Sequence, residues 1–280
     1  MGRIFRKKIS DVRPQDQVAL PESEPGQNVL AESGAVGGPN AVFSALKNRP
    51  HSCRSLMVAD GRRGRGPIAE ILSLARAASV PVKIVPRTAL DRVYGGEGHQ
   101  GVVAVFDPLA YATEDFLAEL PADGSVLVLA LDKVEDPGNL GALIRSAAAF
   151  GARAVVAPRD HMAPLTPGAL RAAAGAAEIV PLVRVTNLRR ALEKLQKQGF
   201  WIVGADGDGS QTLAEFDFPQ RTVLVLGSEG RGLSDIIKKN CDFILAVDQK
   251  RGAVSSLNVS VAGGIIMNAY FCRHLSGGDL

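Results

Sequence analysis

Three short stretches in the second half of the chain carry uncommon polar residues inside apolar surroundings. Residues 136–139 read Asp-Pro-Gly-Asn and lead to Arg145, residues 226–230 read Leu-Gly-Ser-Glu-Gly, and residues 256–260 read Ser-Leu-Asn-Val-Ser. Amide, carboxylate, hydroxyl and guanidinium groups can bind a polar molecule and stabilise charge that develops during a reaction. If the chain performs chemistry, we expect it where these three stretches meet.

Each stretch also has an explanation that needs no ligand. Glycines after a strand can simply make a tight turn, an arginine among alanines usually faces solvent, and Asn258 and Ser260 can cap a helix. The glycine-rich stretch is not followed by the lysine and serine or threonine of a triphosphate-binding loop, and no dinucleotide fingerprint is present. Nucleoside triphosphate chemistry is therefore not expected.

Metal binding is not predicted either. The four histidines are far apart, and the three cysteines, Cys53, Cys241 and Cys272, show neither zinc-ligand spacing nor a disulfide framework. Residues 206–210 read Asp-Gly-Asp-Gly-Ser, but the segment lacks the glycine and the glutamate that a calcium-binding EF-hand loop needs, so we interpret it as a turn.

Composition predicts a cytoplasmic globular protein. The chain of 280 residues is 46% hydrophobic and is long enough for one large domain or two small ones. No apolar run reaches the roughly 20 residues of a membrane span, and no apolar signal-peptide core follows the basic start. The net charge of +3 is compatible with a nucleic-acid partner but does not require one.

The first part of the chain divides into a tail and a small domain. Residues 1–37 show no hydrophobic period, which predicts a flexible tail. Residues 38–107 predict a compact α/β domain with helices near 40–47 and 66–78, strands at 55–59 and 82–85, and an apolar run at 101–106. An arginine-rich turn at 61–66 could contact phosphates or could be a solvated turn.

The second part alternates short apolar strands with helices. After a linker at 108–124 with one short helix, residues 125–275 predict strands at 126–131, 154–157, 179–183, 201–205, 223–226 and 243–247, and helices at 139–150, 167–176, 187–198, 233–239 and 256–274. This alternation is typical of an α/β fold with a parallel sheet covered on both faces. Ligands bind at the carboxyl ends of such strands, which places the three polar stretches along one edge.

Taken together, the three stretches resemble the ordered motifs of the SpoU/TrmH (SPOUT superfamily) RNA ribose 2′-O-methyltransferases. Residues 98–104, Gly-His-Gln-Gly-Val-Val-Ala, also resemble the closing signature of the ribosomal-protein-like RNA-binding domain in the large-subunit rRNA guanosine methyltransferases of this family. The resemblance covers about residues 38–275. In its light, the arginine-rich turn favours RNA contact.

The resemblance implies a fold, a cofactor and partners. The catalytic domain would thread its C-terminal segment through a loop to form a trefoil knot, one of the rare exceptions to ordinary chain connections. S-adenosyl-L-methionine would lie bent in the knotted loops and touch Gly227, Val247 and Leu257. RNA would be the substrate, with rRNA favoured over tRNA, and two copies of the chain would form a homodimer.

The resemblance also assigns catalytic roles. Methyl transfer to a ribose hydroxyl needs alignment and proton removal rather than a metal. Arg145 would act as a fixed cation beside that hydroxyl, because a guanidinium stays protonated. Asn139 would orient Arg145 or the ribose, and Glu229 would pair with an arginine and hold its loop. Ser256 and Asn258 would hydrogen-bond RNA or close the active site.

One segment departs from the family pattern. Family members usually carry Ile-Pro-Met, one further residue and Gly before the third motif, whereas residues 247–252 here read Val-Asp-Gln-Lys-Arg-Gly. This segment is polar, lacks the proline and is one residue longer. The difference affects the cofactor contact that the resemblance assigns to Val247. The leading hypothesis is 2′-O-methylation of a guanosine in large-subunit rRNA. The alternatives are a tRNA ribose 2′-O-methyltransferase and a non-catalytic RNA-binding or ribosome-assembly protein.

Overall fold

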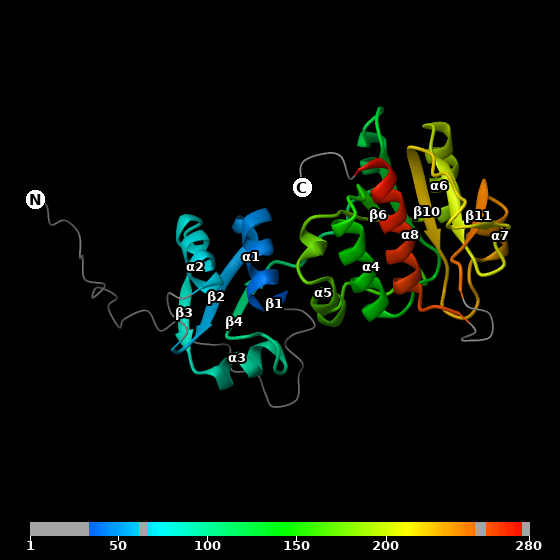
Figure 1. Cartoon of the computed structure of the whole chain (residues 1–280). Coiled ribbons are helices and arrows are strands. Elements are labelled where there is room, and N and C mark those ends of the chain that lie inside the picture. The colour runs from blue at the N-terminus through cyan, green and yellow to red at the C-terminus, as the bar shows by residue number, and fades with distance from the viewer. Residues whose placement is uncertain (1–33, 62–65, 250–255, 276–280) are drawn as a thin grey trace, which may run out of the picture.

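The chain forms two α/β domains that lie side by side and are joined by a connecting segment (Figure 1). The computed structural model describes residues 34–61, 66–249 and 256–275. The predicted tail up to residue 33, the core of the arginine-rich turn and residues 250–255 of the departing segment lie outside the described residues. Within the described ranges, no helix is long and apolar enough to cross a membrane.

The first domain is a four-stranded sheet with helices on both faces. Its strand order is β1-β4-β2-β3, with β4 antiparallel to both of its neighbours. Helices α1 and α2 pack on one face of the sheet and α3 packs on the other, where Leu90 meets Met57 and Val103. The elements are β1 (Ala35–Gly37), α1 (Pro39–Asn48), β2 (Cys53–Ala59), α2 (Pro67–Ala77), β3 (Val82–Val85), α3 (Arg87–Tyr94) and β4 (Val102–Phe106).

Two elements of this domain were not predicted from the sequence. Strand β1 pairs Ala35 with Val105, so the domain begins before the boundary expected at residue 38. A strand of three residues is too short to give a periodic signal. Helix α3 is only eight residues long and buries two of them, Leu90 and Tyr94.

The second domain contains the predicted parallel sheet. Its strand order is β7-β6-β5-β10-β8-β11-β9, and every pairing is parallel. Strands run from β5 outward to β7 and then resume on the other side at β8, which creates a switch point between β5 and β10. The strands are β5 (Val126–Leu131), β6 (Ala154–Pro158), β7 (Leu182–Val185), β8 (Trp201–Ala205), β9 (Gln211–Thr212), β10 (Arg221–Leu226) and β11 (Phe243–Ala246).

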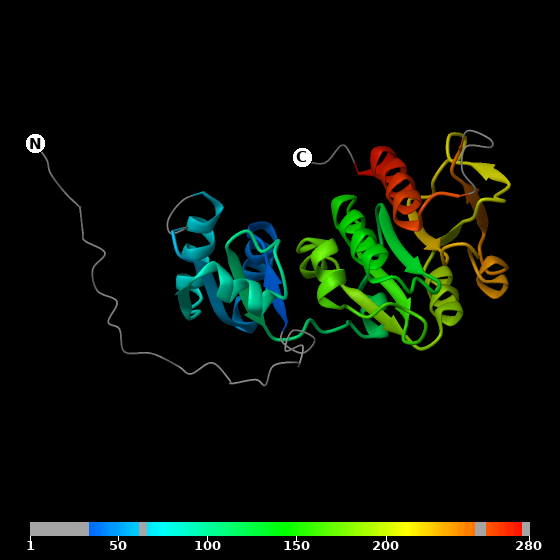
Figure 2. The ribbon, with the colours of Figure 1, turned by 90° about the horizontal axis from the view of Figure 1, so that it is seen from below.

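Helices cover both faces of this sheet, as predicted (Figures 1 and 2). Alternate residues of β5 point to opposite faces, so Leu129 packs in the cluster beneath α4, α5 and α8, and Val128 packs in the cluster beneath α6 and α7. The helices are α4 (Pro137–Ala149), α5 (Pro167–Ala173), α6 (Leu188–Lys197), α7 (Asp235–Lys238) and α8 (Val259–His274), and short 3₁₀ turns are η1 (Pro50–Ser52), η2 (Glu114–Glu119) and η3 (Ala176–Glu178).

The strand predicted at 179–183 is wrong by several residues. Strand β7 begins only at Leu182, because the preceding segment forms η3. Gly175, at a left-handed φ of 90°, ends the helical region and lies against α1 of the first domain, where an added Cβ would stand 2.9 Å from the Cβ of Ser44. The residues before β7 thus form a turn that lies against the first domain, a contact that no local pattern encodes.

A buried ion pair fixes the contact between the two domains. The Arg49 guanidinium donates to both carboxylate oxygens of Glu178, at 2.5 and 2.9 Å, and its third nitrogen donates to the carbonyl of Asp107 at 2.5 Å. The Glu178 side chain is only 5% exposed. Bidentate geometry of this kind holds orientation as well as contact, so the first domain has a defined position relative to the second.

Candidate active site

The three polar stretches meet at one side-chain amide. The Nδ2 of Asn258 donates to the Oδ1 of Asn139 at 2.9 Å and to the Oε1 of Glu229 at 2.5 Å. Asn139 lies in the first turn of α4, Glu229 in the loop after β10, and Asn258 just before α8. We call these three residues the amide junction. Their meeting on the carboxyl edge of the sheet agrees with the sequence prediction.

Helix capping holds two members of the amide junction in place. Asp136 caps α4 by accepting from the Asn139 N–H at 2.7 Å, and Pro137 fits the first helical position. Asn258 caps α8 through its Oδ1, which accepts from the backbone N–H of Ser260 at 2.9 Å. Asn258 therefore caps a helix and also contacts the other site residues, so the capping interpretation and the site interpretation are compatible.

The loop after β10 is fastened so that Glu229 can reach the junction. Ser228 and Gly232 exchange two backbone hydrogen bonds of 3.0 Å each. Gly227 lies so close to Gly232 that an added Cβ would stand 2.1 Å from the Gly232 carbonyl carbon. The buried carboxylate of Asp132, at the end of β5, accepts from the Ser234 N–H at 2.7 Å and ties the loop to the neighbouring strand.

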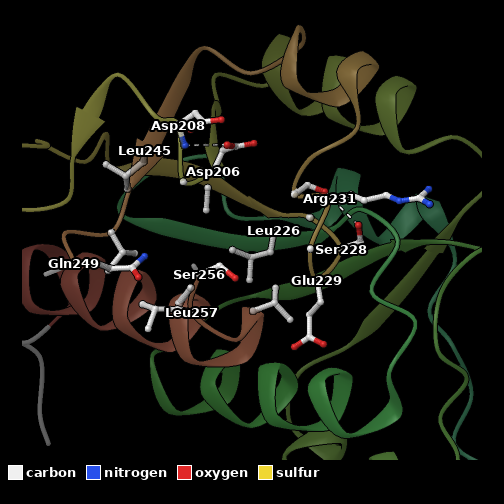
Figure 3. Close-up of a pocket in the computed structure, with 18 residues that line it drawn as sticks. Asp206, Asp208, Leu226, Ser228, Glu229, Arg231, Leu245, Gln249, Ser256 and Leu257 are labelled. Carbon is white, nitrogen blue, oxygen red and sulfur yellow. Dashed lines mark hydrogen bonds between the residues drawn. The ribbon is translucent and has the colours of Figure 1, made fainter. Parts of the chain in front are cut away.

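A cavity of about 340 Å³ opens beside the amide junction, between the carboxyl ends of β8, β10 and β11 and the start of α8. Figure 3 shows Ser256 and Leu257 facing Leu226, Ser228 and Glu229 across it. All three residues expected to touch a cofactor, Gly227, Val247 and Leu257, line this cavity. A volume of this size suits a small organic ligand.

Two carboxylates that were not predicted from the sequence form an acidic wall of this cavity. Asp206 and Asp208 line it, although their segment was interpreted as a plain turn. Asp206 accepts from the Asp208 N–H at 3.1 Å, and its other carboxylate oxygen lies 3.1 Å from the Lys238 Nζ. The position of Asp206 directly after β8 was the available signal, because it places the residue on the same carboxyl edge as the other site groups.

Arg145 stands apart from the amide junction within one chain. It is exposed on α4, does not line the cavity, and among the described residues forms no hydrogen bond or ion pair. Glu229 also lacks the arginine partner expected from the resemblance: in the part of the chain that is described, its partner is the amide of Asn258.

Burial raises the pKa of the Cys241 thiol to about 12, with further contributions from Asp242 and Asp132, so Cys241 is a poor nucleophile. Across residues 34–61, 66–249 and 256–275, no group of three His, Cys, Asp or Glu side chains is placed to hold a metal ion.

Comparison with known families gives an assignment for both domains. Residues 126–268 match the SpoU rRNA methylase family, and residues 35–112 match the RNA 2′-O ribose methyltransferase substrate-binding family. The chain therefore belongs to the SpoU rRNA methylase family. The start of the second match at residue 35 agrees with the position of strand β1.

Individual relatives span nearly the same length. The chain is 43% identical over 235 residues to the 23S rRNA (guanosine-2′-O-)-methyltransferase RlmB of Pseudomonas aeruginosa, covering 83% of this chain and 93% of the relative. It is 40% identical over 240 residues to the protein of the same name from Coxiella burnetii, covering 85% and 95%. Among solved structures, the SpoU methyltransferase AviRb of Streptomyces viridochromogenes in complex with AdoMet superposes with a TM-score of 0.71 at 26% identity, covering 91% and 95%.

Substitution of Gly227 tests the close backbone approach that shapes the cavity. Gly227→Ala places a methyl group against the Gly232 backbone, and we expect the free energy of unfolding to fall by about 1–3 kcal/mol, as for other overpacked sites. Gly207→Ala is the matched control, because Gly207 lines the same cavity but has open space around it. Urea titrations measure both variants, and equal stabilities would contradict the proposed packing.

Proposed function

We propose that this protein transfers a methyl group from S-adenosyl-L-methionine to the 2′-oxygen of a ribose, in a guanosine of large-subunit rRNA. The amide junction carries the proposal: polar groups from three distant segments converge on the carboxyl edge of the sheet, beside a cavity of suitable size. The two relatives named RlmB are 23S rRNA guanosine methyltransferases, and this chain matches them over almost their whole length. They support the choice of substrate.

The cavity suits S-adenosyl-L-methionine on chemical grounds. The cofactor combines a flat adenine with positive charge on sulfur and on its amino group. Leu226, Leu245 and Leu257 offer apolar contact for the ring, Gly227 lets the backbone approach closely, and the carboxylate of Asp208 can face positive charge. When bound, the cofactor supplies an electrophilic methyl group. The AviRb structure contains this cofactor, which further supports the assignment.

The donors and acceptors that are already used within the amide junction indicate the role of each residue. Both N–H groups of the Asn258 amide are used by Asn139 and Glu229, and its oxygen is used by the α8 cap. Asn258 is therefore a positioning residue rather than an RNA contact. The groups left for the substrate are the Asn139 amide nitrogen, the second Glu229 oxygen and the Ser256 hydroxyl. We assign Asn139 and Glu229 to orienting the ribose.

Residues 247–252, the segment that differs from the family pattern, reach the cavity in their described part. Val247 and Gln249 both line it, and the Asp248 carboxylate accepts from the Ala214 N–H at 3.4 Å. The part of this segment that the structure describes therefore contributes side chains to the cofactor cavity. This favours a catalytic protein over the alternative of an RNA-binding protein that has lost its cofactor.

A homodimer is part of the proposal, and an exposed apolar face supports it. Helix α8 packs on α4, and the outward side of this pair exposes Val261 by 50% and Ile265 by 40%. Gly264 lies between them, and a Cβ added there would stand 3.5 Å from the Ser146 hydroxyl on α4. Because Arg145 precedes Ser146, a second copy packed on this face would bring Arg145 into a less solvated position.

We also propose the trefoil knot, a cytoplasmic site of action and rRNA rather than tRNA as the substrate. Helix α8 follows residues 250–255 and returns to pack on α4 and β10, an arrangement compatible with the trefoil knot. A cytoplasmic site of action fits an rRNA substrate. The substrate-binding match over residues 35–112 favours rRNA over tRNA, because it adds an RNA-binding domain to the catalytic one.

Methyl transfer tests the proposed activity and the role of Arg145 together. We expect the native protein to transfer labelled methyl from S-adenosyl-L-methionine to ribose in large-subunit rRNA that lacks its own ribose methylations. Arg145→Ala should lower the rate by roughly 100-fold, as expected for loss of a group that stabilises developing charge. Arg190→Ala, an exposed arginine on α6, is the control and should keep the native rate. Absence of both transfer and cofactor binding in the native protein would favour the non-catalytic alternative.

The homodimer proposal predicts a change of mass on charging the α8 face. The double substitution Val261→Glu, Ile265→Glu places two carboxylates in the proposed interface, where desolvation opposes association. Light scattering should then report a monomer where the native protein is a dimer. Ile236→Glu is the control, since Ile236 is 65% exposed on α7 and lies elsewhere. A native monomer, or a dimer that survives the double substitution, would exclude this interface.

A further inference from the structure

Lys133 has an unusual backbone conformation at the carboxyl edge of the sheet. It is exposed, follows β5 and has a left-handed φ of 63°, which glycine adopts freely and lysine does not. Both neighbours are buried and fixed: Asp132 donates its N–H to the Leu226 carbonyl at 2.8 Å, and the carbonyl of Val134 accepts from the Ala163 N–H at 2.9 Å. The fold therefore holds the lysine outward at a position where glycine would fit without strain.

Lys133 lines a second cavity, which adjoins the cofactor cavity. This second cavity measures about 330 Å³ and shares the loop residues Ser228, Glu229, Arg231 and Gly232 with the first. In Figure 3 the guanidinium of Arg231 points away from Ser256 and Leu257. The two cavities therefore meet at Glu229, a member of the amide junction.

The charges in the second cavity are unevenly satisfied. One oxygen of Glu229 accepts from Asn258, and the exposed Glu135 carboxylate lies 3.8 Å from the His161 Nδ1. The two cations have no such partner, because neither Lys133 nor Arg231 has a side-chain hydrogen bond or ion pair with any described residue. Two cations without partners, beside the Ser234 hydroxyl, offer donors for an anion.

We propose that the second cavity binds a phosphate of the substrate RNA strand, held by Lys133 and Arg231. The inference rests on the proposed function, because it identifies which part of the RNA lies beside the amide junction. A phosphodiester next to the target ribose would place the 2′-oxygen toward Glu229 while its charge faces the two cations. Phosphate contacts fix position rather than sequence, so Lys133 would set the register of the strand.

Lys133→Gly separates this role from a structural one. Glycine relieves the left-handed φ, so the melting temperature should stay level or rise, while RNA affinity falls. We expect the slope of log affinity against log salt to lose about one unit, as for removal of a single phosphate contact. The loss in methyl transfer should lie in KM for RNA, and the dissociation constant for S-adenosyl-L-methionine should not change. Lys133→Arg keeps the positive charge, so it should keep both the native affinity and the native slope.

A lysine far from the second cavity serves as the control for Lys133. Lys197→Gln removes an exposed lysine at the end of α6, on the opposite edge of the sheet, and should leave binding unchanged. Native RNA affinity and salt slope in Lys133→Gly would overturn the phosphate site. Weaker cofactor binding at unchanged RNA affinity would assign Lys133 to the cofactor instead. If the native protein transfers no methyl at all, the proposed function fails, but the salt slope of RNA binding still decides the role of Lys133.

Discussion

The side-chain amide of Asn258 joins the three polar stretches of the candidate active site. This one group uses both of its N–H bonds to hold Asn139 and Glu229, and its oxygen to begin helix α8. Segments that are 119 and 29 residues away in sequence are thereby fixed to the start of a helix. Because both N–H groups and the oxygen of this amide are used, we propose that Asn258 positions the groups around it and that Asn139 and Glu229 face the substrate.

Close backbone packing makes this convergence possible. A Cβ at Gly141 would stand 2.2 Å from the Ala169 carbonyl oxygen, so α4 and α5 approach more closely than side chains would allow. Gly263 places α8 directly against Leu143 and Leu226, the last residue of β10. These glycines bring the first turns of α4 and α8 within hydrogen-bonding reach of the loop after β10, and the cofactor cavity opens beside them.

Much of the fold followed from the sequence because the signals are local. Alternating apolar strands and helices predict the parallel sheet, and Thr166 and Asn187, which are good helix-capping residues, cap α5 and α6. The meeting of the polar stretches followed from a rule of topology, since carboxyl ends of parallel strands share one edge. Periodicity could not reveal β1, because a strand of three residues is too short to show a period.

What the sequence could not provide were contacts that depend on three-dimensional packing. The helical turn before β7 contacts the first domain, and the hydrogen-bond partner of Glu229 follows from where α8 begins. The left-handed backbone of Lys133 is likewise set by its buried neighbours. The resemblance grouped Arg145 with the amide junction, because Arg145 belongs to the same motif as Asn139.

The most direct test of this account is the rate of methyl transfer by Asn258→Ser. Serine is as good a helix cap as asparagine, so α8 should still form, but serine cannot hold Asn139 and Glu229 together. The account predicts a rate lower by roughly 100-fold, the scale of a lost active-site orientation, with the circular dichroism spectrum unchanged. Asn268→Ser, farther along the same helix, should keep the native rate. A native rate in Asn258→Ser would contradict the central role of the amide junction.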